Sequence, residues 1–312
     1  MIIGVIAYCC LDCANNQQEN IEYGVAEKNS IEQALEMVGY YRDDTLVKCN
    51  TVIAVIDTKY DLSEIEDGDL WNNKEEIPGN GIDDDKNGCI DDIYGWNFVD
   101  NSNEIQTNEL CSHGTMMLHA LDDYGVEIMP ITVLDTEGKG TTHSIVEAIQ
   151  YAEEKGADIC NLSISTYEDN RELESVIHHS NMLFIVAAGN AGEELNDENK
   201  CYPACYDEDN LITVAACDSD YNIIENSNYG KDYVDLVAPG DCIGIELVNG
   251  GHTVVEGTSF ATALVSRIAA LIRNREVIKY DAKEMKQRIL NTVKKKESLS
   301  NKVKSSGIIN ID

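Results

Sequence analysis

Hydrophobic and polar positions follow two different periods along this chain. Short runs of apolar residues, bounded by Gly, Asn, Asp or Ser, recur from residue 51 onward, and runs of this kind are typical of buried strands. Between several of them, apolar residues stand three or four positions apart, as on one face of a helix. The apolar runs predict strands over 51–56, 127–133, 159–164, 183–188, 211–216 and 234–237.

The helical pattern is clearest in four segments. Residues 142–155 and 172–180 are amphipathic, and we expect them to be crossover helices on the faces of a sheet. Residues 259–273 are rich in Ala, Leu and Ile on all sides, which predicts a central helix that is largely buried. The segment 282–294 predicts a last amphipathic helix, with Lys294, Lys295 and Lys296 near its C-terminal dipole. Alternating strands and helices predict an α/β fold with a mainly parallel sheet.

Length and charge narrow the class of protein. A chain of 312 residues is long enough for one large core, and no internal repeat or low-complexity linker divides it. It has 57 acidic and 23 basic residues, a formal charge of -34, which repels nucleic acid and anionic membranes. We therefore expect no nucleic-acid partner. No apolar stretch is long enough to span a bilayer, so we expect no membrane span, and a monomer is the simplest assembly.

The cysteines indicate the redox environment. There are eleven, an odd number, scattered through apparent strands and loops rather than grouped as a disulfide framework. Cys10 and Cys13 have the spacing of a metal or redox pair, but no second pair accompanies them, and we interpret them as ordinary thiols. Residues 1–11 are apolar without a preceding basic residue, which makes a poor secretory signal. We expect a cytoplasmic protein; secretion is the alternative if the chain is a processed form.

Three short segments carry the candidate chemistry, in the order Asp, His, Ser. Asp57 ends the apolar run that begins at residue 51, His113 stands in Ser-His-Gly-Thr, and Ser259 stands in Gly-Thr-Ser-Phe-Ala. A serine hydroxyl is a weak nucleophile, so it needs an imidazole to accept its proton and a carboxylate to orient that imidazole. The sequence contains all three groups.

These segments resemble the subtilisin-like serine peptidases, a family with this order of catalytic residues. Further segments at 187–192, 202–204, 227–230 and 237–240 are similar to sequence motifs of the same family. The resemblance implies a three-layer subtilisin-like fold with a mainly parallel central sheet and helices on both faces. It also places a peptidase domain over 21–312, after an N-terminal tail over 1–20, because Tyr23-Gly24-Val25 resembles the start of a mature catalytic domain.

The resemblance assigns roles to single residues. It makes Ser259 the nucleophile, His113 the general base and then acid, Asp57 the residue that orients His113, and Asn190 the oxyanion donor. It also implies that a substrate peptide pairs with one segment and fills a pocket lined by another. The expected substrate-binding residues are Ser163, Ile164, Ser165, Ala187, Ala188 and Gly189.

Two departures from the family pattern bear on this site. Ser165 stands where Gly is usual, and we expect its side chain to narrow the substrate groove. Lys59 replaces a usual Gly two residues after Asp57, where it either lowers the proton affinity of that carboxylate or points to solvent. The sequence leaves both alternatives for Lys59 open.

An acidic loop over 79–92 contains Asp-x-Asp-x-Asn-Gly, whose alternating oxygens and glycine turn suit Ca²⁺. We expect Asp83, Asp85 and Asn87 as ligands, with Asp91 as a fourth, and similar insertions in relatives are calcium loops. Tyr94 stands where a full twelve-residue calcium loop would end in Glu. The ion would stabilise the protein rather than catalyse.

The sequence therefore predicts a serine endopeptidase that acts on a peptide or protein substrate through an acyl-enzyme, with structural calcium. A narrower hypothesis is a dedicated processing peptidase that removes a leader from a precursor peptide. The competing class is a catalytically silent subtilase homologue that keeps the groove and binds peptides. A calcium-dependent structural module is a third class, but it leaves the Asp, His and Ser without a role.

Overall fold

The computed structural model describes residues 29–40, 51–65, 69–109, 111–121, 125–247, 252–275 and 280–311. The expected tail over 1–20, the Cys10 and Cys13 pair, and the segment 23–25 lie outside the described residues.

Strand β2 (Thr51–Asp57) shows how the sheet builds two cores. All seven of its residues are buried. Ile53 and Val55 belong to one hydrophobic cluster, and Val52, Ala54 and Ile56 belong to a second one. Successive side chains of a strand point to opposite faces, so β2 is covered on both sides, which explains its uninterrupted apolar run.

Nine strands of the described chain form the main sheet in the order β11-β12-β8-β7-β6-β5-β2-β4-β3. All neighbouring pairs are parallel except β11 with β12. After β2 the chain adds β4 on one side and then β5 on the other, so the strand order reverses at β2, where open α/β sheets place their ligands. The other strands are β3 (Trp96–Asn97), β4 (Val126–Thr132), β5 (Ile159–Leu162), β6 (Leu183–Ala187), β7 (Leu211–Cys217), β8 (Leu236–Pro239), β11 (Lys294–Lys295) and β12 (Gly307–Ile308).

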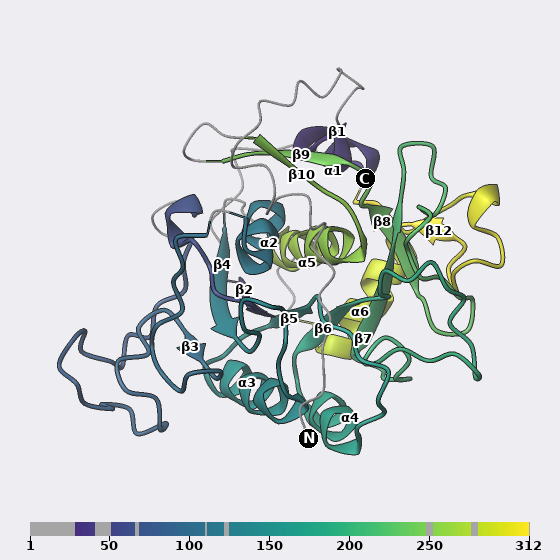
Figure 1. Ribbon diagram of the computed structural model, residues 1–312. Coiled ribbons are helices and arrows are strands. Elements are labelled where there is room, and N and C mark those ends of the chain that lie inside the picture. Colours follow the sequence, from purple (N-terminus) through teal and green to yellow (C-terminus); the bar gives the residue numbers. More distant parts are fainter. Residues whose placement is uncertain are drawn as a thin grey trace.

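Helices cover both faces of this sheet, and a smaller sheet lies beyond one helical layer (Figure 1). One cluster joins the sheet to α3 and α4, and the other joins it to α2, α5 and α6. The helices are α1 (Ile31–Met37), α2 (His113–Leu121), α3 (Thr142–Glu154), α4 (Arg171–His179), α5 (Thr258–Arg275), α6 (Ala282–Thr292) and the 3₁₀ turns η2 (Leu62–Glu64) and η3 (Glu297–Leu299). The small sheet has the order β1-β9-β10, from β1 (Asn29–Ser30), β9 (Ile243–Glu246) and β10 (His252–Val255).

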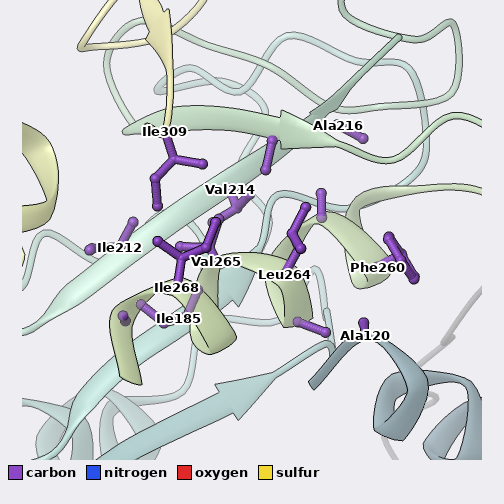
Figure 2. Packing of buried hydrophobic residues seen from close by; sticks show 14 of the residues in the cluster. Ala120, Ile185, Ile212, Val214, Ala216, Phe260, Leu264, Val265, Ile268 and Ile309 are labelled. Atoms are coloured by element: carbon purple, nitrogen blue, oxygen red, sulfur yellow. The ribbon is translucent and has the colours of Figure 1, made fainter. Parts of the chain in front are cut away.

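Helix α5 is the centre of the larger core. Every residue from Thr258 to Ile272 is buried. Figure 2 shows Phe260, Leu264, Val265 and Ile268 of this helix among apolar side chains of the sheet. Burial on all sides agrees with the prediction from its uniformly apolar composition, and it fixes the position of the helix start, which carries Ser259.

The predicted α/β architecture with a mainly parallel sheet is confirmed, and each predicted strand exists with ends shifted by two residues or fewer. One prediction at the C-terminus is wrong. The last helix ends at Thr292, and Lys294 and Lys295 form β11 opposite Gly307 and Ile308 instead of extending the helix. β-branched Thr292 and Val293 favour an extended chain over another helical turn.

No helix among the described residues is long and apolar enough to cross a membrane.

Candidate active site

A buried carboxylate and imidazole pair forms the centre of the site. Asp57 is the last residue of β2 and has no exposed surface, and His113 is the first residue of α2 and is 7% exposed. The His113 Nδ1 atom lies 2.8 Å from each carboxylate oxygen of Asp57. Since Asp57 can only accept, Nδ1 carries the proton, and the other ring nitrogen is the basic one in neutral His113.

The start of α2 is held directly against the segment that follows β2. The backbone N–H of Gly114 donates to Thr58 Oγ1 at 2.9 Å, and the Ser112 hydroxyl donates to the Lys59 carbonyl at 2.8 Å. A Cβ atom at Gly114 would lie 2.8 Å from both the Thr58 carbonyl oxygen and the Tyr60 ring, so only glycine allows this approach. These contacts set the distance between Asp57 and His113.

The pKa of His113 is raised above its usual value of 6.5. Burial lowers this pKa, but the charge of Asp57 and its hydrogen bond together raise it by more. The Nε2 atom of His113 is buried and makes no hydrogen bond to the described part of the chain. A buried basic nitrogen of this kind is able to accept a proton from a hydroxyl that approaches it.

Ser259 stands one residue inside α5, which begins at Thr258 rather than at Ser259 as predicted. It is 8% exposed. Its carbonyl accepts a hydrogen bond from the Ser163 hydroxyl at 3.2 Å, and Asn161 of β5 bonds both Ser163 and, through its amide oxygen, Ser266 of α5. Buried polar contacts between β5 and α5 therefore fix the backbone that carries Ser259.

The side chain of Asn190 is oriented by the same helix start. Its Oδ1 atom accepts from the backbone N–H of Thr258 at 2.9 Å and from the Thr258 hydroxyl at 2.8 Å. A backbone N–H can only donate, so the oxygen must face Thr258 and the Nδ2 donor faces away from it. Asn190 thus presents an N–H donor beside the N-terminus of α5, where backbone N–H groups lack intrahelical partners.

The expected substrate-binding residues form two neighbouring segments. Ser163, Ile164 and Ser165 continue β5 beyond its last paired residue, while Ala187 ends the neighbouring strand β6 and Ala188 and Gly189 follow it. Ser163, Ile164, Ala187 and Ala188 are buried, and Ala188 has no exposed surface. These side chains are therefore packed within the protein beneath the site.

Ser165 is half-buried, and its hydroxyl hydrogen-bonds to the thiol of Cys201. That sulfur lies 3.5 Å from where a Cβ of Gly189 would stand, so the two segments expected to bind substrate meet at Cys201. Burial raises the pKa of the Cys201 thiol to about 12, so the group is a neutral thiol at physiological pH.

The side chain of Lys59 pairs with a carboxylate other than that of Asp57. Its ammonium lies 3.2 Å from a carboxylate oxygen of Asp100, and both side chains are partly exposed. Lys59 therefore forms a surface ion pair with Asp100 next to the site.

A second cluster of charged groups lies in the loop between η2 and β3. One carboxylate oxygen from each of Glu76, Asp83 and Asp85 lies within 4.8 Å of the others. Oxygen ligands of this kind match the preference of Ca²⁺, so the residues present fit the expected ion. Glu76 is buried, and its carboxylate also accepts from the backbone N–H groups of Asp84, Asp85 and Asp91.

Of the four ligands expected from sequence, the structure groups Asp83 and Asp85 with Glu76. The carboxylate of Asp91 instead accepts from the backbone N–H groups of Asn80 and Gly81, at 3.1 and 2.9 Å. The amide oxygen of Asn87 accepts from the N–H of Cys89 at 2.6 Å. Both side chains shape the loop through these backbone contacts, and Asn87 also donates from Nδ2 to Asp92 at 2.9 Å; their role as calcium ligands stays a prediction.

The same loop is attached to helix α3 through buried polar contacts. Lys155, which caps the end of α3, forms an ion pair with Asp85. The Tyr151 hydroxyl donates to Asp92 at 2.7 Å, and Asp92 has no exposed surface. Burial raises the pKa of Asp92, although hydrogen bonds from Tyr151, Asn87 and Asn73 lower it. The loop that carries the acidic cluster is thus held against α3 by buried polar contacts.

Three residues of the site carried no role in the sequence-based prediction. Thr258 orients Asn190, and Asn228 bonds the backbone N–H groups of Ala191 and Glu193 beside it. Both stand in motifs that resemble the family, Gly-Thr-Ser and Ser-Asn-Tyr-Gly, so the motif itself was the available signal. Glu76 lies outside the Asp-x-Asp-x-Asn-Gly motif, and only the folded loop brings it to Asp83.

Comparison with known proteins agrees with this geometry. Residues 48–306 match the family described as the subtilase family, peptidase S8. The chain belongs to the subtilase family. Subtilisin-like protease 1 of Plasmodium berghei (strain Anka) is 28% identical over 329 residues, which cover 95% of this chain and 54% of that protein. The chain spans about half the length of the curated relatives it matches.

Solved structures show the same fold. The epidermin leader peptide processing serine protease (EpiP) of Staphylococcus aureus superposes with a TM-score of 0.70 at 20% identity, covering 89% of this chain and 78% of that one. A lanthipeptide protease superposes with a TM-score of 0.67 at 21% identity, covering 89% and 91%. This subtilase therefore has the subtilisin-like three-layer fold predicted from its sequence.

Proposed function

We propose that this subtilase is a serine endopeptidase that cleaves peptide bonds through an acyl-enzyme. The Ser259 hydroxyl attacks the scissile carbonyl carbon while its proton passes to His113 Nε2. Asp57 holds the imidazole in the tautomer with Nδ1 protonated and stabilises the imidazolium that forms. The carbonyl oxygen becomes an oxyanion, which receives hydrogen bonds from Asn190 Nδ2 and from the backbone N–H of Ser259.

The intermediate then collapses, the C–N bond breaks, and His113 gives its proton to the leaving amine. A water molecule attacks the acyl-enzyme, loses a proton to His113, and the acid product leaves Ser259 with its hydroxyl restored. Each proton that His113 accepts is returned in the following half-step.

One observation carries this proposal. Asp57 holds His113 Nδ1 by two contacts of 2.8 Å, while the opposite ring nitrogen is buried without a hydrogen-bond partner among the described residues. A buried polar atom without a hydrogen-bond partner is uncommon in folded proteins, and in His113 it stands opposite a nitrogen that a carboxylate holds. We assign the hydroxyl of Ser259, near the start of the neighbouring helix α5, as the proton donor to this nitrogen.

The test is labelling with a serine-directed fluorophosphonate, read by intact mass. Wild-type protein should gain one label, and Ser259→Ala should gain none. Ser175→Ala, which changes a serine on α4 away from the site, is the matched control and should label like wild type. A folded wild-type protein that gains no label would support the silent peptide binder instead.

We further propose that the substrate is a precursor peptide from which this enzyme removes a leader. The support is the likeness in fold to the structures of an epidermin leader peptide processing protease and of a lanthipeptide protease. Profiling on a random peptide library tests this specificity: cleavage at one or a few sequence contexts is expected, and equal rates across the library would contradict it.

We also propose a structural Ca²⁺ held by Glu76, Asp83 and Asp85, whose oxygens converge as described. The bound ion would neutralise repulsion between three carboxylates and so hold the loop over α3. It would take no part in the chemistry at Ser259.

For cellular location, we propose the cytoplasm. The support is that all seven cysteines in the described part of the chain are free thiols, as is usual in a reducing compartment. Fractionation of native cells tests this, and recovery in the extracellular fraction would contradict it.

A further inference from the structure

Asn228 is a buried residue enclosed by the loop that carries Asn190. It is 1% exposed. Its Oδ1 atom accepts from the backbone N–H groups of Ala191 and Glu193, at 3.1 and 3.0 Å, and its Nδ2 donates to the Ala188 carbonyl at 2.9 Å. One side-chain amide thus bonds both halves of the loop 188–193.

The backbone adds a fourth contact. The N–H of Asn228 donates to the Gly189 carbonyl at 2.8 Å. Gly189 has φ +99°, and a Cβ there would lie 2.6 Å from Asn228 Nδ2. Asn228 and Gly189 therefore fit each other closely, and the path of the loop on either side of Asn190 follows the shape of the Asn228 amide.

We propose that Asn228 is a positioning residue for the oxyanion donor, an inference that rests on the proposed peptidase function. The two ends of Asn190 are fixed separately: Thr258 orients its side chain, and Asn228 fixes the backbone from which that side chain projects. Asn228 makes its contacts to residues before and after Asn190. An oxyanion donor works only within a few tenths of an ångström of its ideal place, so a loop that relaxes loses catalysis before it loses the fold.

A double-mutant cycle tests this proposal. Asn190→Ala, Asn228→Ala and the double variant are compared with wild type on a peptide substrate, with active sites counted by fluorophosphonate labelling. Asn228→Ala should lower kcat per active site by about 10- to 100-fold and change KM by less than about threefold. In the Asn190→Ala background the same change should cost less than about threefold, because the donor it positions is already absent.

Asn210→Ala is the matched control for the loss of a buried asparagine. Asn210 is also buried, and its Nδ2 donates to the carbonyls of Ile177, Ser180 and Met182. It directly precedes β7, at the opposite end of that strand from the site. Its loss should lower the melting temperature and leave kcat per active site unchanged. If Asn228→Ala does not fold, Asn228→Asp replaces it in the cycle, since it keeps the shape and both acceptor contacts but loses the donor to Ala188.

Two results would overturn the inference while leaving the peptidase function intact. One is a kcat equal to that of wild type in Asn228→Ala. The other is a double variant whose reduction in kcat equals the product of the reductions in the two single variants. Wild-type protein that neither labels nor cleaves would instead overturn the proposed function, and the positioning role with it.

Discussion

Single side chains at this site are oriented by partners that can bond in only one way. Asp57 can only accept, which sets the tautomer of His113, and the Thr258 N–H can only donate, which sets the amide of Asn190. The geometry of both groups therefore follows from the chemistry of their neighbours. The raised pKa of His113 is a measurable consequence of the same arrangement.

Activity should fall on the acid side with a pKa above 6.5. His113 accepts a proton only when neutral, and the nearby Asp57 stabilises its protonated form, so its pKa is raised. Activity is therefore full above the pKa of the folded enzyme and is lost as the pH falls through it. The measurement is kcat/KM against pH. Asp57→Asn should lower kcat by about 10⁴-fold and shift this acid limb to lower pH; an unmoved limb would contradict the role of Asp57.

Sequence predicted the proposed catalytic residues where the chemistry stands inside a contiguous motif. Asp57, His113, Asn190 and Ser259 each stand in such a motif, and the structure brings Asp57 to His113 and Asn190 to the start of α5. Sequence was insufficient for Glu76 and Asn228, because their roles depend on partners that are distant in the chain or on backbone groups, which every residue has.

At the scale of elements, the loop between η2 and β3 is attached to the body through α3. Lys155 and Tyr151 of that helix region meet Asp85 and Asp92 of the loop in buried contacts. Local sequence pattern predicted α3 from its apolar face, but it could not predict these polar contacts, because their partners are loop residues far away in the chain. Helix α2 was missed for a related reason: its residues are nearly all buried, so it has no polar face to reveal its period.

Calcium should stabilise the protein against heat, and Glu76 should be needed for this effect. Adding Ca²⁺ at about 100 times its dissociation constant would add about 2.7 kcal/mol to the free energy of unfolding. Removal with EGTA should lower the melting temperature, and Glu76→Gln should remove most of the difference between the two conditions. The control is Glu75→Gln, which changes an exposed neighbour. Equal calcium shifts in the two variants would exclude Glu76 as a ligand.

Tyr151→Phe should destabilise the attachment of the loop to α3. The change removes the hydroxyl that donates to the buried Asp92 carboxylate, and a hydrogen bond to a charged group contributes about 1.5–3 kcal/mol. Urea unfolding measures the loss. Tyr94→Phe, at an exposed position of the same loop, should change the stability by less than about 0.5 kcal/mol. Equal losses at both positions would show that the contact with Asp92 contributes nothing specific.

The whole molecule carries a large excess of negative charge. With a formal charge of -34, the folded chain concentrates mutual repulsion that the unfolded chain spreads over a larger volume. Ion pairs such as Lys59 with Asp100 offset only part of this, because basic residues are few. Electrostatics across the molecule therefore oppose the compact state.

Salt should raise the melting temperature. Repulsion between surface charges is screened beyond about 10 Å at 0.1 M ionic strength, so raising NaCl from about 20 mM to about 300 mM should stabilise the fold. The scan is run in EGTA, so that metal binding does not contribute, and is repeated with choline chloride to separate screening from sodium binding. A melting temperature that falls or stays constant in both salts would contradict this account.

The groups to which we assign catalysis come from distant parts of the chain, and an active peptidase of this kind would be its own substrate when it opens. Asp57 and His113 are 56 positions apart, and Asn190 and Thr258 are 68 apart, so any opening of the sheet or of α5 separates them. A molecule that opens loses its activity at once, and its exposed backbone becomes a substrate for molecules that remain folded. Inactivation by heat would then involve two copies of the protein and would be faster in concentrated solution, until cleavage outpaces reclosing and the rate of opening becomes the limit.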